Sequence, residues 1–291
     1  MLSQPPVKQI AAIHDLSGCG RTSLSVVIPI LSAMGIKVCP LPTAILSSHS
    51  RYEGYHFVDL TYHMQPVIDH WKKLNVFFDA IYSGFLGSHK QIRIVQGMID
   101  TFTNEGQLVV IDPVLGDNGK MYGPIKKKMV SEMKSLIQKA NIITPNLTES
   151  SLLLGKPFKS DISEKDIKEW MLQLSDMGPE IVVITSVPDK TPGKKFSVIA
   201  YNRNDSRFWK VPIDYITADF PGTGDCFTSV LTGSLLQGDS LPIALERAVH
   251  FISYGVRATF GYRYDQNQGI LLERVLNRLN SPMSVSSYEI I

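Results

Sequence analysis

The sequence has few cysteines and no long hydrophobic run. Its three cysteines, Cys19, Cys39 and Cys226, are far apart and odd in number, which argues against a disulfide framework or a structural zinc site. No apolar stretch approaches the roughly 20 residues that a membrane span requires. The segment from Met1 to Lys8 holds no apolar run typical of a signal peptide. We therefore expect a cytoplasmic protein with no membrane partner.

The chain also lacks a strong excess of charge of either sign. Its 29 Lys and Arg residues against 27 Asp and Glu residues give a formal net charge of +2, too small to indicate a nucleic-acid partner. With 291 residues, 44% of them hydrophobic, it is long enough to bury a large core. No linker or internal repeat interrupts it, so we predict one domain spanning residues 1–291.

Short runs rich in Val and Ile alternate along the chain with longer segments of helical period. The predicted strands are 10–13, 36–45, 77–82, 108–111, 141–143 and 181–184. The predicted helices between and after them are 22–34, 62–74, 90–102, 125–138, 148–154 and 164–177. Apolar strands that do not alternate with polar residues, separated by helices, are typical of a parallel sheet covered on both faces.

The last third of the chain departs from this alternation. Residues 196–201 and 207–211 are joined by a turn-rich segment and predict a hairpin. Helices are expected near 227–236, 241–259 and 270–279. The predicted fold class is α/β: a doubly wound, mostly parallel central sheet with helices on both faces and a late β-hairpin.

The most informative motif is the glycine turn that runs from Pro221 to Asp225. Gly222, Thr223 and Gly224 precede a helix, and free backbone N–H groups at a helix start suit phosphate oxygens. The carboxylate of Asp225 at that place can accept the proton of an attacking alcohol, while the amides hold a transferring phosphoryl group. The alternative is a plain turn in which Asp225 only caps the helix.

Further polar side chains follow the predicted strands, at the end where ligands bind in open parallel sheets. Asp112 follows the strand 108–111, and Asp117 lies in the glycine-bearing loop after it. Two acids in this place can hold Mg²⁺ through water. The alternative is a common Asp-Pro turn without a function.

The next two strands end in similar polar segments. Thr144 follows the strand 141–143, and Asn146 and Glu149 have the spacing of a helix-capping pair, although Glu149 can also orient metal-bound water. Thr185 and Ser186 end the strand 181–184 and can line a nucleotide pocket, but hydroxyls are frequent at strand ends.

The first strand leads into a glycine-rich segment that begins with His14 and Asp15. Both residues should face the same end of the sheet as Asp112, which favours a substrate role over a turn that serves packing alone. Cys226, beside the proposed base, is more typical of a buried small apolar residue than of a nucleophile.

The glycine turn before Asp225 resembles the signature of the ribokinase-like superfamily, in which the last acid is the catalytic base. Together with five further stretches it is similar to the pyridoxal kinases, in matching order from about residue 10 to residue 260. The six stretches are 16–21, 41–50, 83–87, 110–117, 143–149 and 220–225.

This resemblance implies ATP-dependent phosphorylation of the 5′-hydroxymethyl group of pyridoxal, pyridoxine or pyridoxamine. It assigns Asp225 as the base, Gly222, Thr223 and Gly224 as the anion cradle, and Asp112, Asp117 and Glu149 to Mg²⁺ and the phosphates. It places Thr144, Thr185 and Ser186, with Asp112, near ATP, and Ser50 and Phe85 at the pyridoxal ring. We also assign Asp15 to the substrate.

The resemblance further implies a homodimer, stimulation by K⁺, and a flap over the active site formed by residues 115–124. Two other functions remain open. The segment His14-Asp15-Leu16 stands where many members of the resembling family carry Gln-Ser-His. In this segment the chain is more similar to the hydroxymethylpyrimidine (phosphate) kinases of thiamine synthesis. A protein that binds pyridoxal phosphate without catalysis is the third hypothesis.

Overall fold

The sheet that was expected runs through the whole molecule. The computed structural model describes residues 6–123, 125–190, 194–214, 220–280 and 288–291. Ten strands form one sheet in the order β12-β11-β10-β9-β8-β5-β4-β1-β2-β3. Their bounds are β1 Gln9–Cys19, β2 Lys37–Ser48, β3 Phe57–Asp59, β4 Ala80–Ser83, β5 Leu108–Ile111, β8 Ile142–Ile143, β9 Ile181–Pro188, β10 Lys194–Asn202, β11 Arg207–Asp214 and β12 Glu289–Ile290.

The six central strands, from β2 to β9, pair in parallel. Antiparallel strands extend both edges: β3 on one side, and β10, β11 and β12 on the other. The predicted late hairpin is confirmed, with Asn202 paired to Arg207 at its tip. Because the central strands are parallel, their carboxyl ends meet at one edge, where the polar segments that follow them are brought together.

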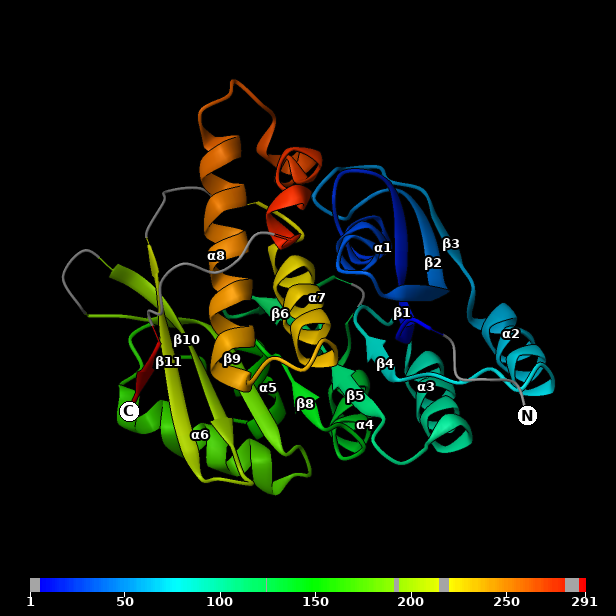
Figure 1. Ribbon diagram of the computed structural model, residues 1–291, viewed down its shortest axis with the longest axis horizontal. Coiled ribbons are helices and arrows are strands. Elements are labelled where there is room, and N and C mark those ends of the chain that lie inside the picture. Colours follow the sequence, from blue (N-terminus) through cyan, green and yellow to red (C-terminus); the bar gives the residue numbers. More distant parts are fainter. Residues whose placement is uncertain (1–5, 124, 191–193, 215–219, 281–287) are drawn as a thin grey trace.

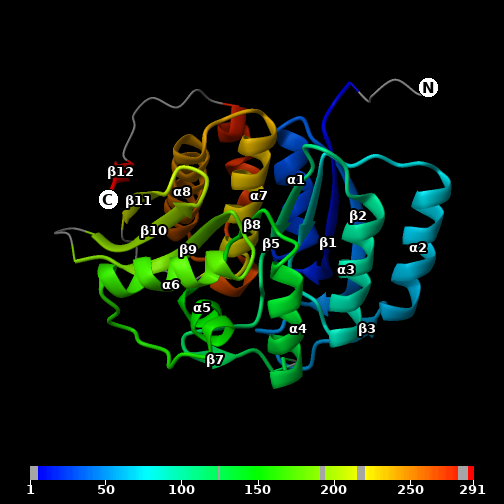
Figure 2. The ribbon, with the colours of Figure 1, turned by 90° about the horizontal axis from the view of Figure 1, so that it is seen from below.

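Helices cover both faces, which confirms the doubly wound arrangement (Figures 1 and 2). The side chains of Ala11 and Ile13 belong to the core on one face, and those of Ile10 and Ala12 to the core on the other. The first face carries α2 Thr61–Lys73, α3 His89–Phe102, α4 Lys127–Ile137, α5 Leu147–Leu154 and α6 Glu164–Asp176. The second carries α1 Leu24–Ala33, α7 Thr223–Leu236 and α8 Leu241–Phe260.

Local sequence explains where several helices start. The Ser88 side chain accepts a hydrogen bond from the Gln91 N–H at the start of α3. Ser163 accepts one from the Asp166 N–H at the start of α6. Each serine therefore satisfies an N–H group that lacks a partner within the helix. Most apolar residues of both helices lie on one face, which directs that face to the sheet, whereas Leu172 of α6 is exposed.

The prediction of one α-helix at 270–279 is wrong. This segment folds as two short 3₁₀ helices, η2 Leu272–Arg274 and η3 Leu276–Asn280, after a third one, η1 Gln266–Gln268. Its apolar residues Ile270, Leu272, Val275 and Leu279 are all buried. Successive short turns bury the same residues as one α-helix would, so the apolar spacing did not distinguish them.

Four short strands and several strand boundaries were also missed, since β1 continues to Cys19, β2 to Ser48 and β9 to Pro188. The strands are β3, β12 and the separate pair β6 Gly116–Asp117 and β7 Lys120–Met121. The strand predicted at 77–82 begins only at Ala80. Strands of two or three residues carry too few side chains to show a period, so sequence patterns rarely reveal them.

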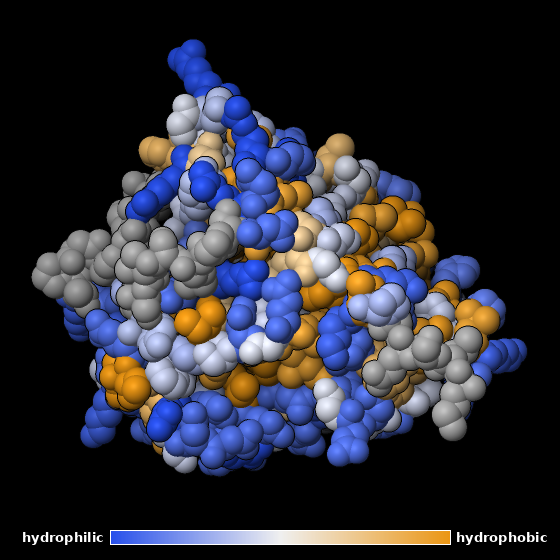
Figure 3. All heavy atoms as spheres, viewed as in Figure 1, coloured by the Kyte–Doolittle hydropathy of each residue, from blue (hydrophilic) through white to orange (hydrophobic). Residues whose placement is uncertain are grey.

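The surface is hydrophilic around much of its rim, with hydrophobic residues gathered toward the middle and right of the face in Figure 3. Several large apolar side chains are exposed along the edge formed by β2, β3 and α2, including Ile45, Phe57, Val58 and Tyr62. Within the described parts of the chain, no helix combines the length and apolar character needed to cross a membrane.

Candidate active site

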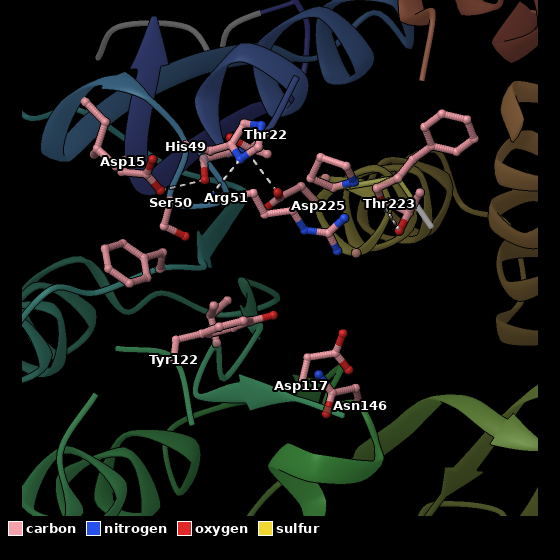
Figure 4. Close-up of a pocket in the computed structure, with 18 of the residues that line it drawn as sticks. Asp15, Thr22, His49, Ser50, Arg51, Asp117, Tyr122, Asn146, Thr223 and Asp225 are labelled. Atoms are coloured by element: carbon pink, nitrogen blue, oxygen red, sulfur yellow. Dashed lines mark hydrogen bonds between the residues drawn. The ribbon is translucent and has the colours of Figure 1, made fainter. Parts of the chain in front are cut away.

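A cavity of about 310 Å³ lies where the loops after the central strands meet the start of α7 (Figure 4). Ten of the predicted site residues line it: Asp15, Ser50, Phe85, Asp117, Thr185, Ser186, Gly222, Thr223, Gly224 and Asp225. In Figure 4 one wall carries Asp15, Ser50 and Asp225, and the facing wall carries Tyr122, Asp117 and Asn146. The chain therefore brings these distant segments together around one space.

Three predicted residues do not line the cavity and are buried instead. Asp112, Thr144 and Glu149 expose 7%, 3% and 4% of their surface. The Thr228 hydroxyl of α7 donates a hydrogen bond of 3.0 Å to the Thr144 hydroxyl, which ties the end of β8 to α7. These residues can act on a ligand through charge, or through water, more readily than by direct contact.

The start of α7 requires glycine at Gly222. Its φ of 80° lies in the left-handed region, and a Cβ there would come within 2.0 Å of the Arg21 carbonyl oxygen. The first helical bond runs from the Cys226 N–H to the Gly222 carbonyl, so the amides of Thr223 to Asp225 precede it. These amides are free of helical partners, so they can bind an anion such as a phosphate.

Asp225 is anchored outside its own helix. Its Oδ2 accepts a 2.9 Å hydrogen bond from the Ser23 N–H, whereas the N-cap of α7 is Gly222, which has no side chain to cap with. The alternative of an ordinary helix cap at Asp225 is therefore wrong. Burial raises the pKa of Asp225 to about 7, against the opposing effect of the Ser23 N–H. A carboxylate with this pKa is suited to proton transfer near neutral pH.

Ser23 connects the two carboxylates of this wall. Its hydroxyl donates a 2.5 Å hydrogen bond to Oδ1 of Asp15, and the Ser17 hydroxyl donates one of 3.2 Å to Oδ2. Burial raises the pKa of Asp15, and the two hydroxyl donors oppose that rise. Ser23 has a φ of 53°, which is unfavourable for a residue with a Cβ and is frequent at functional sites.

Glu149 is held quite differently, by backbone amides on two sides. Its Oε2 accepts a 2.8 Å bond from the Asn146 N–H, and the Glu149 N–H donates to the Asn146 side chain. The two residues form the capping box that was the alternative explanation. Oε1 accepts a further bond from the Leu115 N–H at 3.1 Å. Burial nevertheless raises the pKa of Glu149 to about 8.

The loop predicted as a flap is a small hairpin of β6 and β7. The Asn146 side chain donates to the Gly116 carbonyl at 2.8 Å, and the Gly119 N–H donates to the Thr148 hydroxyl at 2.9 Å. Both bonds tie the hairpin to the start of α5. Asp117 from this hairpin and Tyr122 just after it line the cavity. Pro124, the last residue of the predicted flap, lies outside the described residues.

The predicted metal residues do not form a direct three-ligand cluster. Across the described ranges, no group of three or more His, Cys, Asp or Glu side chains is arranged to hold a metal ion. Burial raises the pKa of Asp112 well above its usual range, and the charges of Glu149 and Asp225 raise it further. Three acids thus share one poorly hydrated region, which a cation in the neighbouring cavity would stabilise.

Several residues of the cavity wall were not predicted. His49, Arg51, Tyr55 and Phe57 come from the loop and edge strand after β2, and Tyr122 follows the hairpin. In Figure 4 the Arg51 side chain extends from this loop toward the helix start that carries Asp225. A signal in the sequence was Arg51, directly after the stretch that ends at Ser50, followed within a few residues by Tyr55 and Phe57.

A segment near the C-terminus, residues 264–269, holds two loops of this wall. The Arg21 N–H donates to the Gln268 carbonyl at 3.1 Å, and its guanidinium donates to the Tyr264 hydroxyl at 2.5 Å. His49 Nε2 lies 2.6 Å from the Asn267 carbonyl oxygen, so Nε2 carries the proton and donates it. The segment fixes the loop behind Gly222 and the loop before Ser50 in one arrangement.

The comparison with known proteins decides the family. The sequence family described as phosphomethylpyrimidine kinase matches residues 63–270, more than half of the chain. The chain belongs to this kinase family. It is an ATP-dependent kinase, and its resemblance to the ribokinase-like pyridoxal kinases is confirmed. A pyridoxal kinase of Arabidopsis thaliana is 30% identical over 279 residues, covering 89% of this chain and 87% of the relative.

Solved structures of this family share the fold over nearly the whole chain. A candidate phosphomethylpyrimidine kinase of Bacteroides thetaiotaomicron, solved with pyridoxal, is 58% identical with a TM-score of 0.95 and covers 98% of this chain and 100% of its own. The pyridoxal kinase of Lactobacillus plantarum is 29% identical with a TM-score of 0.85 and covers 94% of this chain and 96% of its own. A protein that binds without catalysis does not agree with membership of this family.

Proposed function

We propose that this kinase transfers the γ-phosphoryl group of ATP to the 5′-hydroxymethyl group of pyridoxal, pyridoxine or pyridoxamine. The observation that carries the proposal is the relative solved with pyridoxal, which is 58% identical over almost the whole chain. The cavity supports it, because Ser50 and Phe85 line the same space as the cradle before Asp225. A ring against Phe85 and a hydroxymethyl group near Asp225 would fill that space.

In the proposed reaction Asp225 acts as the general base. Its ionised carboxylate accepts the proton of the hydroxymethyl group while the oxygen forms its bond to the γ-phosphorus. The bond from that phosphorus to the bridging oxygen breaks at the same centre, and ADP leaves. The amides of Thr223 and Gly224 hold the oxygens of the transferring group, and the helix dipole of α7 stabilises their negative charge.

The ring of the substrate is held by the residues of the same wall. The Asp15 carboxylate accepts from Ser23 and Ser17, which fixes its orientation toward the cavity. It can accept a hydrogen bond from a donor group on the ring. Thr185 and Ser186 lie inside β9, where its pairing with β10 shifts register, and line the part of the cavity that we assign to the nucleotide.

Mg²⁺ fits the acidic side of the cavity. Asp117 lines the space directly, while Asp112 and Glu149 are buried acids whose pKa values are raised by burial and by the charges of neighbouring acids. We propose that these three residues hold the ion through bound water rather than as a direct three-ligand cluster. When bound, the ion neutralises charge on the phosphates of ATP. Stimulation by K⁺ and a homodimer remain predictions from the family resemblance, and a cytoplasmic location remains a prediction from the composition of the chain.

A second candidate is a hydroxymethylpyrimidine (phosphate) kinase. It is favoured by the description of the matching family and by the Asp15 segment of β1. The proposal is tested by measuring product formation with Mg·ATP on pyridoxal, pyridoxine, pyridoxamine, hydroxymethylpyrimidine and its phosphate. We expect the highest kcat/KM on a B6 vitamer. Turnover on the pyrimidines alone would overturn our choice of substrate while leaving the kinase chemistry intact.

A further inference from the structure

His14 lies beside the proposed base, and no step of the proposed reaction uses it. Its side chain is fully buried, and neither Nδ1 nor Nε2 finds a hydrogen-bond partner among the described residues. A buried imidazole without partners destabilises the fold relative to an apolar side chain of similar size. Native proteins keep such groups mainly where function requires them, so His14 needs a functional explanation.

The position of the ring suggests what that function is. His14 Nδ1 lies 3.9 Å from Oδ1 of Asp225, while Oδ2 is the oxygen that accepts the Ser23 N–H. Rotation of the Asp225 carboxylate that closes the gap by about 1 Å would bring Nδ1 and Oδ1 within hydrogen-bond distance. The two oxygens of the base would then each have a donor, one from β1 and one from the residue before α1.

The neighbouring strand leaves room for this ring. A Cβ on Gly84, just after β4, would come within 2.3 Å of His14 Nδ1. The Gly84 N–H donates to the Ile13 carbonyl at 3.0 Å, which holds the two backbones close together. Tyr82 then packs against the imidazole in an edge-to-face contact, with ring centroids 4.3 Å apart. The ring is thus fixed from two sides and cannot easily turn away from Asp225.

The same burial determines the charge of the ring. It lowers the pKa of His14 to about 3, so the imidazole is neutral near pH 7. A neutral imidazole carries one N–H and can donate it to a carboxylate without adding a charge to the site. It cannot compete with Asp225 for the proton of the substrate hydroxyl.

We propose that His14 is a positioning residue, whose Nδ1–H donates to Oδ1 of Asp225 and holds the carboxylate toward the substrate hydroxyl. The proton of the hydroxyl moves to Asp225, and the imidazole keeps its own proton throughout. The inference rests on the proposed role of Asp225 as the base. It adds a residue that makes no contact with either substrate to the machinery of the reaction.

Three variants of His14 test the proposal. His14→Leu removes both nitrogens, His14→Asn keeps a donor near the place of Nδ1, and His14→Gln keeps one near the place of Nε2. For His14→Leu we expect kcat to fall about 30-fold, the size expected for a misplaced catalytic group. The KM values of ATP and pyridoxal should stay within about twofold, and the Tm should be unchanged or raised, because an unpaired buried polar group is removed. His14→Asn should recover most of kcat, and His14→Gln should not.

Two results would overturn the proposal. One is a normal kcat in His14→Leu, and the other is an equal loss of kcat in all three variants together with a lowered Tm, which indicates a packing role. Asp225→Asn, measured in parallel, separates this inference from the proposed function. If Asp225→Asn has a normal kcat, both the proposed base role of Asp225 and the proposed role of His14 are wrong. If Asp225→Asn is inactive while His14→Leu has a normal kcat, only the proposed role of His14 is wrong.

Discussion

Helices α5 and α7 both begin at the cavity and both carry an acid at the third position of their first turn, but the two acids are held in opposite ways. Glu149 accepts from the N–H of its own N-cap, Asn146, and from Leu115. Asp225 turns away from its helix and accepts from Ser23, 202 residues earlier in the chain. One helix has a side-chain cap, and the other starts at Gly222 without one.

The difference separates an acid held at both oxygens by backbone amides from one held at a single oxygen. Both Glu149 oxygens bind backbone amides, and a capping interaction of this kind stabilises a protein by about 1 kcal/mol. Asp225 is anchored through one oxygen only, at the wall of the cavity. The same residue class at the same helix position thus serves two purposes, and the partner of each oxygen decides which.

Removing the charge of Asp225 should have the largest effect. For Asp225→Asn we expect kcat to fall about 1,000-fold, the loss typical of a missing general base, with ATP and pyridoxal binding nearly unchanged. Asp166→Asn is the matched control, because Asp166 occupies the same position in the first turn of α6 and accepts from Ser163. Steady-state turnover and ligand titration check both variants. A kcat of more than one-tenth of normal in Asp225→Asn would contradict the role of Asp225 as the general base.

The two glycines at the start of α7 should differ in a similar way. Gly222→Ala places a Cβ against the Arg21 carbonyl in a left-handed conformation, and we expect a loss of about 3 kcal/mol in the free energy of unfolding. Gly224→Ala meets no protein atom within 4 Å and should leave stability within about 1 kcal/mol. Because Gly224 lines the cavity, its variant should raise the KM of ATP. Denaturant unfolding and initial rates measure both, and equal stability of the two variants would refute the argument.

The pH dependence of the reaction should report the ionisation of Asp225. Burial raises the pKa of Asp225 to about 7, and only its ionised form accepts a proton. We therefore expect kcat/KM to fall about tenfold for each pH unit below that value and to level off above it. Rates measured from pH 5.5 to 9 test this. A flat profile down to pH 5.5 would mean that the carboxylate is ionised more easily than its burial implies.

The smallest effect should come from the cap of α5. Asn146→Ala removes the capping box and the bond to the Gly116 carbonyl, so we expect a loss of about 1 kcal/mol in stability. It should also speed proteolysis within residues 115–123, since the β6–β7 hairpin loses the bond from the Asn146 side chain to the Gly116 carbonyl. Ser163→Ala removes a cap far from the hairpin and serves as the control. If Asn146→Ala and Ser163→Ala speed proteolysis within 115–123 equally, the bond from Asn146 to the Gly116 carbonyl does not hold the hairpin in place.

Sequence patterns were sufficient for the layers of the fold. The strand 108–111 was located at its observed bounds, and the helices of both faces were found within a few residues, because each buries one apolar face against the sheet. The 3₁₀ helices at 270–280 were not predicted, since their buried residues have the same spacing as those of an α-helix. Capping chemistry was also readable, as the spacing of Asn146 and Glu149 shows.

The contacts within the site were less accessible from sequence. Glycines beside an acid pointed to Asp225, but nothing in the order of residues shows that its partner is the backbone of Ser23. His14 was visible only as a polar residue at a strand end, while its significance comes from Asp225 and Gly84, which other elements supply. Such contacts depend on how elements pack, and a pattern along one element does not contain them.

The segment 264–269 also determines when, during synthesis, the kinase can form its site. Residues 9–236 contain all the central strands and both catalytic helix starts, and these can begin to fold as they leave the ribosome. The loops at Arg21 and His49 receive their hydrogen-bond partners only when Gln268 and Asn267 emerge. A nascent chain that ends earlier has the sheet without the fixed loops around Gly222 and Ser50. We therefore expect phosphoryl transfer only after residues 264–269 have left the ribosome.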